Sequence, residues 1–313
     1  MTDSGRPSST LTRSHLLGYI ALCLIWGSTW LAIHIVVSDV PPLEAAAVRF
    51  LLAAFLLLAL AAFQKRPWPK GESQWSAIVV LAITILAVPY GLIFWAEQYV
   101  TSSMTAVLFS AMPLVVALLT PLMTHRTVPR SAVFALVVAF ASLLWLFYAE
   151  LRVSPRALLG GSAVLVAVIV SSWSVVFAKN RLHEIDSVVA TGLQFLFGAV
   201  ALFWGTWALE ARRHAVWTRP AIVAMVFLTV FGSCAAFVVY YWLLKRMQPY
   251  QLATTSLVVP VVAVLEGAFF REQIPLTMVI VIIIVLASVG TVLRAEAGAG
   301  SEEDFILLRG KTP

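Results

Sequence analysis

The sequence predicts an all-α integral membrane protein with ten transmembrane helices, arranged as two inverted five-helix repeats. Of the 313 residues, 61% are hydrophobic and only 12% are charged, whereas a soluble domain usually has about 25% charged residues. A soluble form of this chain would therefore expose large apolar patches. Apolar runs of about 20 residues, the length that crosses a bilayer as a helix, recur along the chain. A pattern of aromatic residues and proline also recurs, which indicates an internal repeat.

Ten segments meet the length criterion, and the loops between them are short and contain charges, Pro and Gly. Such loops leave no room for a soluble catalytic domain. The first segment is too long for the apolar core of a signal peptide, so we expect it to be retained as a span. The predicted spans are residues 16–38, 43–63, 75–96, 103–124, 130–149, 157–178, 188–209, 220–244, 250–270 and 275–293. They form a first repeat (16–149) and a second repeat (157–293) between two cytoplasmic tails (1–15 and 294–313).

Lysine and arginine are distributed unevenly over the predicted loops. With the N-terminus in the cytoplasm, 14 of the 21 lie on the inner side and 6 on the outer side, while Arg49 lies within a span. The positive-inside rule therefore predicts a multi-pass protein of the inner or plasma membrane with both termini in the cytoplasm. The net charge of +6 then belongs to loops and does not form a surface for nucleic acid, so no nucleic-acid partner is expected. The expected partners are lipid and a small-molecule substrate.

The second half repeats the first after a shift of 147 residues, the separation of Pro113 and Pro260. Because each repeat has five spans, an odd number, the two copies must cross the membrane in opposite senses. Inverted repeats are typical of secondary transporters, which bind their substrate near the bilayer midplane between the halves. The superposed pairs are Trp26 and Trp173, Trp30 and Phe177, Phe94 and Tyr241, Trp95 and Trp242, and the two prolines.

Two stretches carry a resemblance to a known family. LCLIWGSTWLAIHIVVSDVPPLEAAAVRFLLAAFLLL and the proline-centred SLVVPVVAVLEGAFFRE resemble the EamA-type drug/metabolite transporter superfamily, over residues 16–294. The resemblance implies a ten-helix fold of two inverted five-helix repeats that moves small metabolites, often exporting amino acids. One departure is visible. The family's first repeat commonly has Glu after its proline span, where this chain has Thr124, His125 and Arg126, while the second repeat keeps Glu272.

Aromatic residues recur at helical spacing in equivalent spans of both halves. Trp26, Trp30 and His34 follow one another every four residues, so they share one stripe of a helix. We expect such residues to wall a central cavity that binds apolar or amphipathic solutes. The alternative is helix packing or an aromatic belt at the membrane interface. The matching residues of the other spans are Trp173 with Phe177, Tyr90 with Phe94, and Phe237 with Tyr241.

Arg49 is the basic residue that lies clearly inside a predicted span. A charge at the centre of a membrane helix costs about 2.5–3.5 kcal/mol on insertion scales, so Arg49 should face a polar interior or a partner. Glu44 is a poor partner, because five residues separate the two by about 140° around a helix. We expect Arg49 to bind a substrate carboxylate, and the alternative is a structural tether to backbone carbonyls. Gln194 is its nearest polar counterpart in the other half.

Pro113 and Pro260 each lack a backbone donor, which leaves the carbonyls of Phe109 and Ser256 without their usual helical partners. Lipid cannot satisfy such groups, so both spans should face inward. The two prolines are candidate hinges for alternating access, with static kinks as the alternative. Glu266 lies roughly 9 Å beyond Pro260 along a helix. It is a candidate for proton coupling, and the alternatives are a structural hydrogen bond or a side chain that reaches toward the outer interface.

These patterns favour a secondary active transporter that works by alternating access, and the resemblance implies export of small metabolites such as amino acids, with aromatic or other apolar ones preferred. We expect a monomer, no metal and no cofactor, since the chain has no GxxxxGK[ST] motif and no metal-ligand spacing of histidines. A membrane-embedded enzyme is a weaker alternative and no enzymatic activity is expected, because Glu44, Glu97, Glu266 and Glu272 are scattered. A channel, or a carrier of nucleotide-sugars or other metabolites, are further alternatives.

Overall fold

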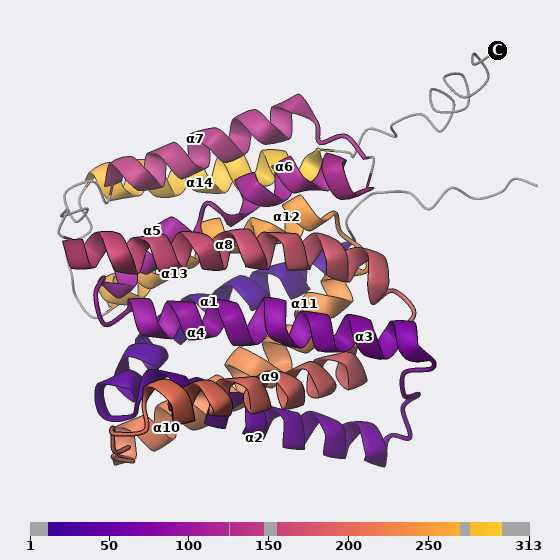
Figure 1. The fold of residues 1–313 in the computed structure, drawn as a ribbon. Helices are drawn as coiled ribbons and strands as arrows, with labels where there is room; N and C mark the ends of the chain where they lie inside the picture. Colours follow the sequence, from indigo (N-terminus) through magenta and orange to yellow (C-terminus); the bar gives the residue numbers. More distant parts are fainter. Residues whose placement is uncertain (1–11, 125, 147–154, 270–275, 296–313) are drawn as a thin grey trace, which may run out of the picture.

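A computed structural model describes residues 12–124, 126–146, 155–269 and 276–295, without the side chains of residues 102–103 and 263–269. Within these ranges every regular element is a helix (Figure 1). Two π-helical segments are η1 (Ala82–Ala87) and η3 (Leu228–Ala235). The other elements are α1 (Arg13–Asp39), α2 (Pro42–Phe63), α3 (Glu72–Leu81), α4 (Val88–Ala96), α5 (Ser102–Phe109), α6 (Met112–Thr124), α7 (Arg130–Leu146), α8 (Pro155–Arg181), α9 (Ser187–Leu209), α10 (Arg219–Phe227), α11 (Ala236–Leu244), α12 (Pro249–Ala253), α13 (Thr255–Phe269) and α14 (Leu276–Arg294).

The described helices confirm a multi-pass membrane protein. Eight continuous helical segments among them are long and apolar enough to cross a bilayer. The number ten stays a prediction, because α7 has only 17 residues and the segment that holds α12 and α13 is divided at Thr254. Large apolar side chains cover the outside of the bundle, with Phe55 and Phe134 more than 70% exposed. Lipid is the solvent in which this exposure is stable.

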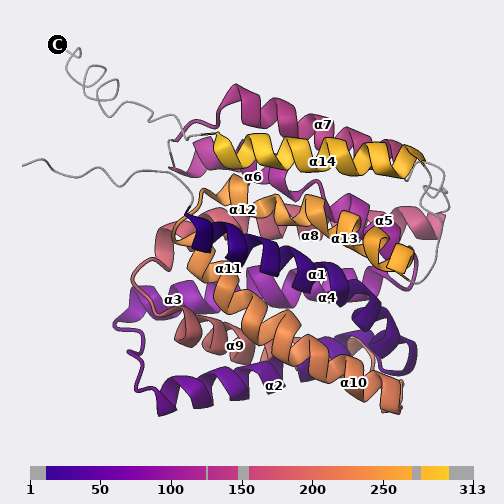
Figure 2. The same cartoon turned by 180° about the vertical axis from the view of Figure 1, so that it is seen from behind.

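The helices lie side by side, with α7 and α14 at one edge of the bundle and α2 with α9 toward the opposite edge in both views (Figures 1 and 2). Helix α2 packs along α9, and helix α7 packs along α14. Helix α1 packs against α13, and helix α6 packs against α8. A shift of 147 residues exchanges α1 with α8, α2 with α9, α6 with α13, and α7 with α14. It therefore maps each of these packing pairs onto itself or onto another pair. The two halves meet through equivalent surfaces.

Both π-helical segments interrupt equivalent spans. The shift places η1 on residues 229–234, inside η3. A π-helical turn has one extra residue and is frequent at functional sites. In η3 the turn brings Gly232 against the first half, where a Cβ would lie 2.9 Å from a Thr29 methyl carbon and 3.1 Å from Arg49 Nη2. Only glycine leaves room there for both side chains.

Gly27, the glycine of the Trp-Gly-Ser motif at residues 26–28 of α1, sets the distance between α1 and α13. A Cβ on Gly27 would lie 2.4 Å from Val262, closer than non-bonded carbon atoms can approach. Small residues allow such close packing of membrane helices. The motif therefore holds a helix of the first half against a helix of the second.

Hydrogen bonds join the start of α1, the segment α12 and the end of α14 to one another at one end of the bundle. Tyr19 Oη and Thr254 Oγ1 lie 2.6 Å apart, and Gln251 Nε2 donates to the carbonyls of Leu293 and Ala295 at 3.2 and 3.1 Å. Helix α1 therefore begins, and helix α14 ends, at the same end of the bundle.

Candidate functional site

A cavity of about 120 Å³ lies between helices of the two halves. Since one water needs about 10–15 Å³ of such space, the cavity holds several waters or a compact solute group. Its walls come from α1, α2, η1, α4, α5 and α6 of the first half and from α8, α11, α12 and α13 of the second. The lining is mostly apolar and aromatic, which is typical of small-molecule sites.

Six of the predicted binding residues line this cavity: Trp26, Trp30, Arg49, Tyr90, Phe94 and Phe237. The ring centroids of Trp26 and Phe237 lie 5.6 Å apart, and those of Tyr90 and Phe237 lie 6.5 Å apart. Aromatic rings at these distances attract one another edge-to-face or tilted. Rings from three spans therefore form one continuous wall.

Five predicted binding residues lie outside the lining. His34 is exposed on the bundle surface, because each step of four residues rotates a helix by about 40° and His34 has turned about 80° from Trp26. Trp173 and Phe177 stack on each other at 4.8 Å along α8. Tyr241 Oη donates to Gln194 Oε1 at 2.5 Å, and both side chains are buried. This pair joins α9 to α11.

Several lining residues were missed by the sequence analysis, among them Thr29, Ile33, Ser171 and Tyr240. On α1 the cavity face runs through residues 26, 29, 30 and 33, where residues 29 and 30 lie three and four positions after 26, and residue 33 lies three and four positions after 30 and 29. This spacing is the ordinary helical period, and it would have found Thr29 and Ile33. No local signal distinguishes Tyr240 from Tyr241.

Arg49 is buried in the wall of the cavity, with 1% of its surface exposed. Its Nε donates to Ser233 Oγ at 2.7 Å, and its Cζ lies 5.5 Å from the centre of the Tyr90 ring. Its Nη1 has no hydrogen-bond partner, and no described carboxylate forms an ion pair with it. Arg49 is thus a membrane-buried cation that is only partly satisfied.

Other buried donors at the cavity also lack partners. Trp26 Nε1 and the Tyr240 hydroxyl have no hydrogen-bond partner in the structure, and both residues line the cavity together with Arg49. An unsatisfied buried polar group costs about 1–3 kcal/mol. Trp and Arg side chains can only donate. The arrangement suits a ligand with oxygen acceptors.

The two candidate hinge prolines act next to the cavity. Pro113 is the second residue of α6, just after the break between α5 and α6, and Pro260 lies inside α13. Phe109 and Ser256, whose carbonyls the prolines leave without their usual donors, both line the cavity.

Glu97 and Glu266 lie near the predicted outer ends of their spans, and of these two acids the structure describes the side chain of Glu97 alone. Glu266 belongs to α13, but its side chain lies outside the described residues. Glu97 is the first residue beyond α4, and neither of its buried carboxylate oxygens has a hydrogen-bond partner. Burial raises the pKa of Glu97 to about 7.

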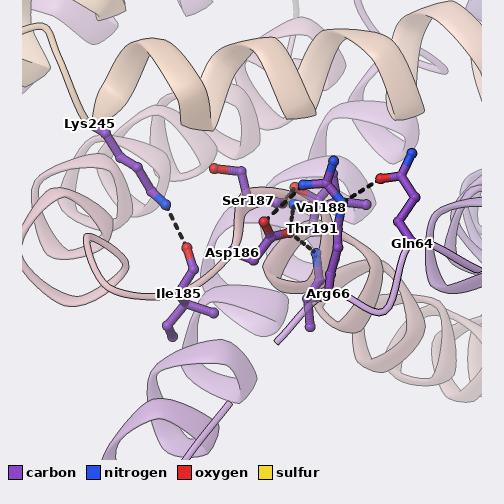
Figure 3. Close-up of polar contacts among 9 residues, drawn as sticks. Gln64, Arg66, Ile185, Asp186, Ser187, Val188, Thr191 and Lys245 are labelled. Atoms are coloured by element: carbon purple, nitrogen blue, oxygen red, sulfur yellow. Dashed lines mark hydrogen bonds and ion pairs between the residues drawn. The ribbon is translucent and has the colours of Figure 1, made fainter. Parts of the chain in front are cut away.

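One end of the α2–α9 pair, which we name the Arg66 end, is joined by charged groups (Figure 3). Arg66 Nη1 lies 2.9 Å from Asp186 Oδ2. Asp186 Oδ1 also caps α9, accepting from the backbone N–H groups of Val188 and Val189 at 2.9 and 3.2 Å. Lys245 Nζ donates to the carbonyl of Ile185 at 2.5 Å, and burial lowers the pKa of Lys245.

The opposite end, which we name the Glu210 end, uses other contacts. Glu210, just after α9, accepts from the backbone N–H of Leu43 at 3.0 Å and so caps the start of α2. Thr218 Oγ1 bonds to Asp39 Oδ2 at 2.6 Å, and Arg213 Nη2 donates to Gln98 Oε1 at 2.7 Å.

Comparisons with known proteins agree with this architecture. The family model for the EamA-like transporter family matches the chain twice, over residues 13–148 and 158–294. "Uncharacterized transporter YoaV" of Bacillus subtilis is 28% identical, with 85% of this chain and 91% of that protein covered. "Protein PagO" of Salmonella typhimurium is 25% identical, with 79% and 81% covered. "Uncharacterized inner membrane transporter YedA" of Escherichia coli is 29% identical, with 79% of each chain covered.

A solved crystal structure of a protein matches the fold with a TM-score of 0.77 at 16% identity, covering 91% of this chain and 99% of the other. Two matches to one family model, over nearly the whole chain, mean that the chain consists of two EamA repeats. The resemblance found in the sequence is confirmed, and the protein is a membrane transporter that belongs to the EamA-like transporter family.

Proposed function

We propose that the protein is a secondary active transporter that exports small amphipathic metabolites such as amino acids, with aromatic and other apolar ones preferred. The observation that carries this proposal is Arg49: a buried cation with a free Nη1, set in an aromatic cavity between the two halves. A carboxylate that bonds to Arg49 and receives a hydrogen bond from Trp26 Nε1 would satisfy both donors. The apolar body of the solute would pack on Tyr90 and Phe237.

Alternating access is supported by the different contacts at the two ends of the α2–α9 pair. The shift of 147 residues maps Arg66 onto Arg213 and Asp186 onto Asp39. Arg66 and Asp186 form an ion pair, but Arg213 and Asp39 bond to other residues. We infer that this conformation is closed at the Arg66 end, and that opening there accompanies pairing of Arg213 with Asp39.

The orientation follows the same reasoning. The start of α1 and the end of α14 lie at one end of the bundle, together with the Arg66 end. Most lysines and arginines also belong there. We propose that this end faces the cytoplasm, with ten spans in two inverted repeats.

A binding and transport assay on purified protein in liposomes tests the proposal. Phenylalanine or leucine should raise the melting temperature and exchange across the membrane by saturable counterflow. Arg49→Gln should weaken binding about 10- to 100-fold, because a hydrogen bond to a charged group contributes about 1.5–3 kcal/mol. Arg212→Gln, at an exposed loop position, is the matched control.

Each competing function predicts a different result. Conductance far above carrier rates would indicate a channel, and chemical conversion of the solute would indicate an enzyme. Binding of sugars or nucleotides, with none of the amino acids, would overturn the proposed substrate class. Equal affinity of Arg49→Gln and the wild type would remove Arg49 from the site.

A further inference from the structure

Two backbone carbonyls at the cavity are released from helical hydrogen bonding in equivalent places. Phe109 and Ser256 are 147 residues apart, and each is followed four residues later by a proline, Pro113 or Pro260. A proline nitrogen carries no hydrogen and cannot donate to the carbonyl four residues earlier. Both Phe109 and Ser256 line the cavity, one from each half of the chain.

The donors that follow Phe109 and the hydroxyl groups next to Ser256 are directed to other carbonyls. The N–H groups of Ser110 and Ala111, which follow α5, donate to carbonyls of Ala106, Val107 and Leu108, but not to Phe109. In the second half, the hydroxyls of Thr254, Thr255 and Ser256 turn back to the carbonyls of Gln251, Leu252 and Ala253. A buried carbonyl without a donor in a membrane protein is tolerated where it faces a cavity or a ligand.

The charge of the lining points to what these carbonyls bind. Arg49 supplies a positive charge, and among the residues whose side chains the structure describes, none that lines the cavity is Asp or Glu. A positively charged group of a ligand therefore meets no described carboxylate in the lining. Carbonyl oxygens carry partial negative charge, and α5 ends at Phe109, so its negative dipole end lies at the same place.

We propose that the carbonyls of Phe109 and Ser256 form a subsite for a primary ammonium group, so that the solutes are zwitterionic amino acids and not simple carboxylates. This inference rests on the proposed function and adds a second recognition element to it. The ammonium group has three donors, of which the two carbonyls accept two. The carboxylate lies at Arg49, on α2, and the ammonium group lies at α5 and α13.

The prolines allow this subsite to be removed without changing a side chain at the ligand. Pro113→Ala and Pro260→Ala each restore an N–H that takes up the carbonyl of Phe109 or Ser256. Binding of phenylalanine is compared with that of 3-phenylpropionate, which lacks only the amino group. We expect the wild type to prefer phenylalanine at least tenfold, and each variant to lose most of this preference while it binds 3-phenylpropionate unchanged.

Pro121→Ala is the matched control. Pro121 also lies inside α6, but it is exposed and the residue four positions earlier, Ala117, does not line the cavity. This variant should keep the preference of the wild type. A purely mechanical role of Pro113 and Pro260 as hinges would change transport rates but not the ratio of the two affinities.

Four results would overturn the inference in different ways. Equal affinity of the wild type for both ligands would remove the ammonium subsite but leave the carrier and its Arg49 site intact. A preference that survives in both alanine variants would place amino-group recognition elsewhere. Stabilisation by sodium chloride but not choline chloride, lost in the variants, would assign the carbonyls to a metal cation. If neither ligand binds, the proposed substrate class fails together with its subsite.

Discussion

The two ends of the α2–α9 pair have equivalent residues and different bonds. At the Arg66 end, Arg66 and Asp186 form an ion pair 2.9 Å long. At the Glu210 end, their equivalents Arg213 and Asp39 bond to Gln98 and Thr218, and Glu210 caps α2. The equivalent of Lys245, which bonds across the Arg66 end, is the uncharged Gln98 at the other end. Equivalent sequence positions therefore form an ion pair at one end and bond to other residues at the other end.

Locking the Arg66 end should have the largest effect. Lys65 and Glu184 are exposed neighbours of the ion pair, so cysteines there leave Arg66 and Asp186 intact. In a background that lacks Cys23 and Cys234, a cleavable bifunctional thiol reagent on Lys65→Cys/Glu184→Cys should reduce counterflow to the background rate. Cleavage of the linker should restore it.

The single-cysteine variants, treated with the same reagent, are the controls and should transport normally. The equivalent pair at the other end, Val37→Cys/Arg212→Cys, should react fastest when the Arg66 end is open. Full counterflow with the Arg66 end cross-linked would contradict the inference that this end opens.

Glu97, the buried acid without a hydrogen-bond partner at the Glu210 end, should produce the second-largest effect, which appears in the pH dependence of stability. Burial raises the pKa of Glu97 to about 7 in the folded protein, against about 4.3 when unfolded. Between these values the folded state binds more protons, so this group makes stability fall as pH rises. The melting temperature of Glu97→Gln relative to wild type should increase from pH 5 to pH 8. Parallel curves for Glu97→Gln and the wild type would refute the argument.

The smallest effect is expected from breaking the ion pair alone. Its side chains are 34% and 20% exposed, and such pairs contribute about 0.2–1 kcal/mol. Arg66→Gln and Asp186→Asn should each raise the open population at the Arg66 end by no more than about fivefold. Distances between spin labels at residues 65 and 184 measure this population. Asp186→Ala should lower stability further, by about 1 kcal/mol, because it also removes the cap of α9.

Much of the architecture could be predicted from local patterns, because lipid imposes a length and a polarity on each span. The Trp-Gly-Ser motif and the proline spans were sufficient to identify the family. Arg49 could be singled out because a charge within an apolar run is rare and costly. The inverted arrangement, the ten spans and the roles of the site residues stay predictions.

The remaining parts of the site depend on contacts between distant segments. Ser233 is 184 positions from Arg49, and only the crossing of α2 with η3 brings them together. The π-helical turns alter the helical period without a sequence signal as clear as proline. Glu97 lay at an estimated span boundary, where its burial depends on the packing of α4 against its neighbours. His34 was assigned to the cavity because a fixed step of four ignores the rotation of a helix.

The contact between Gly27 and Val262 has a consequence for the membrane as an electrical barrier. A cell keeps its ion gradients only while the proteins embedded in its membrane remain sealed between substrate passages. Because a Cβ at residue 27 would lie 2.4 Å from Val262, any larger residue there forces α1 and α13 apart beside Trp26. We expect such a gap along the seam between the halves to raise the leak of small ions, which an ion-flux assay on Gly27→Leu in liposomes measures. On this expectation, the absence of a side chain at Gly27 serves the insulation of the bilayer as well as the packing of two helices.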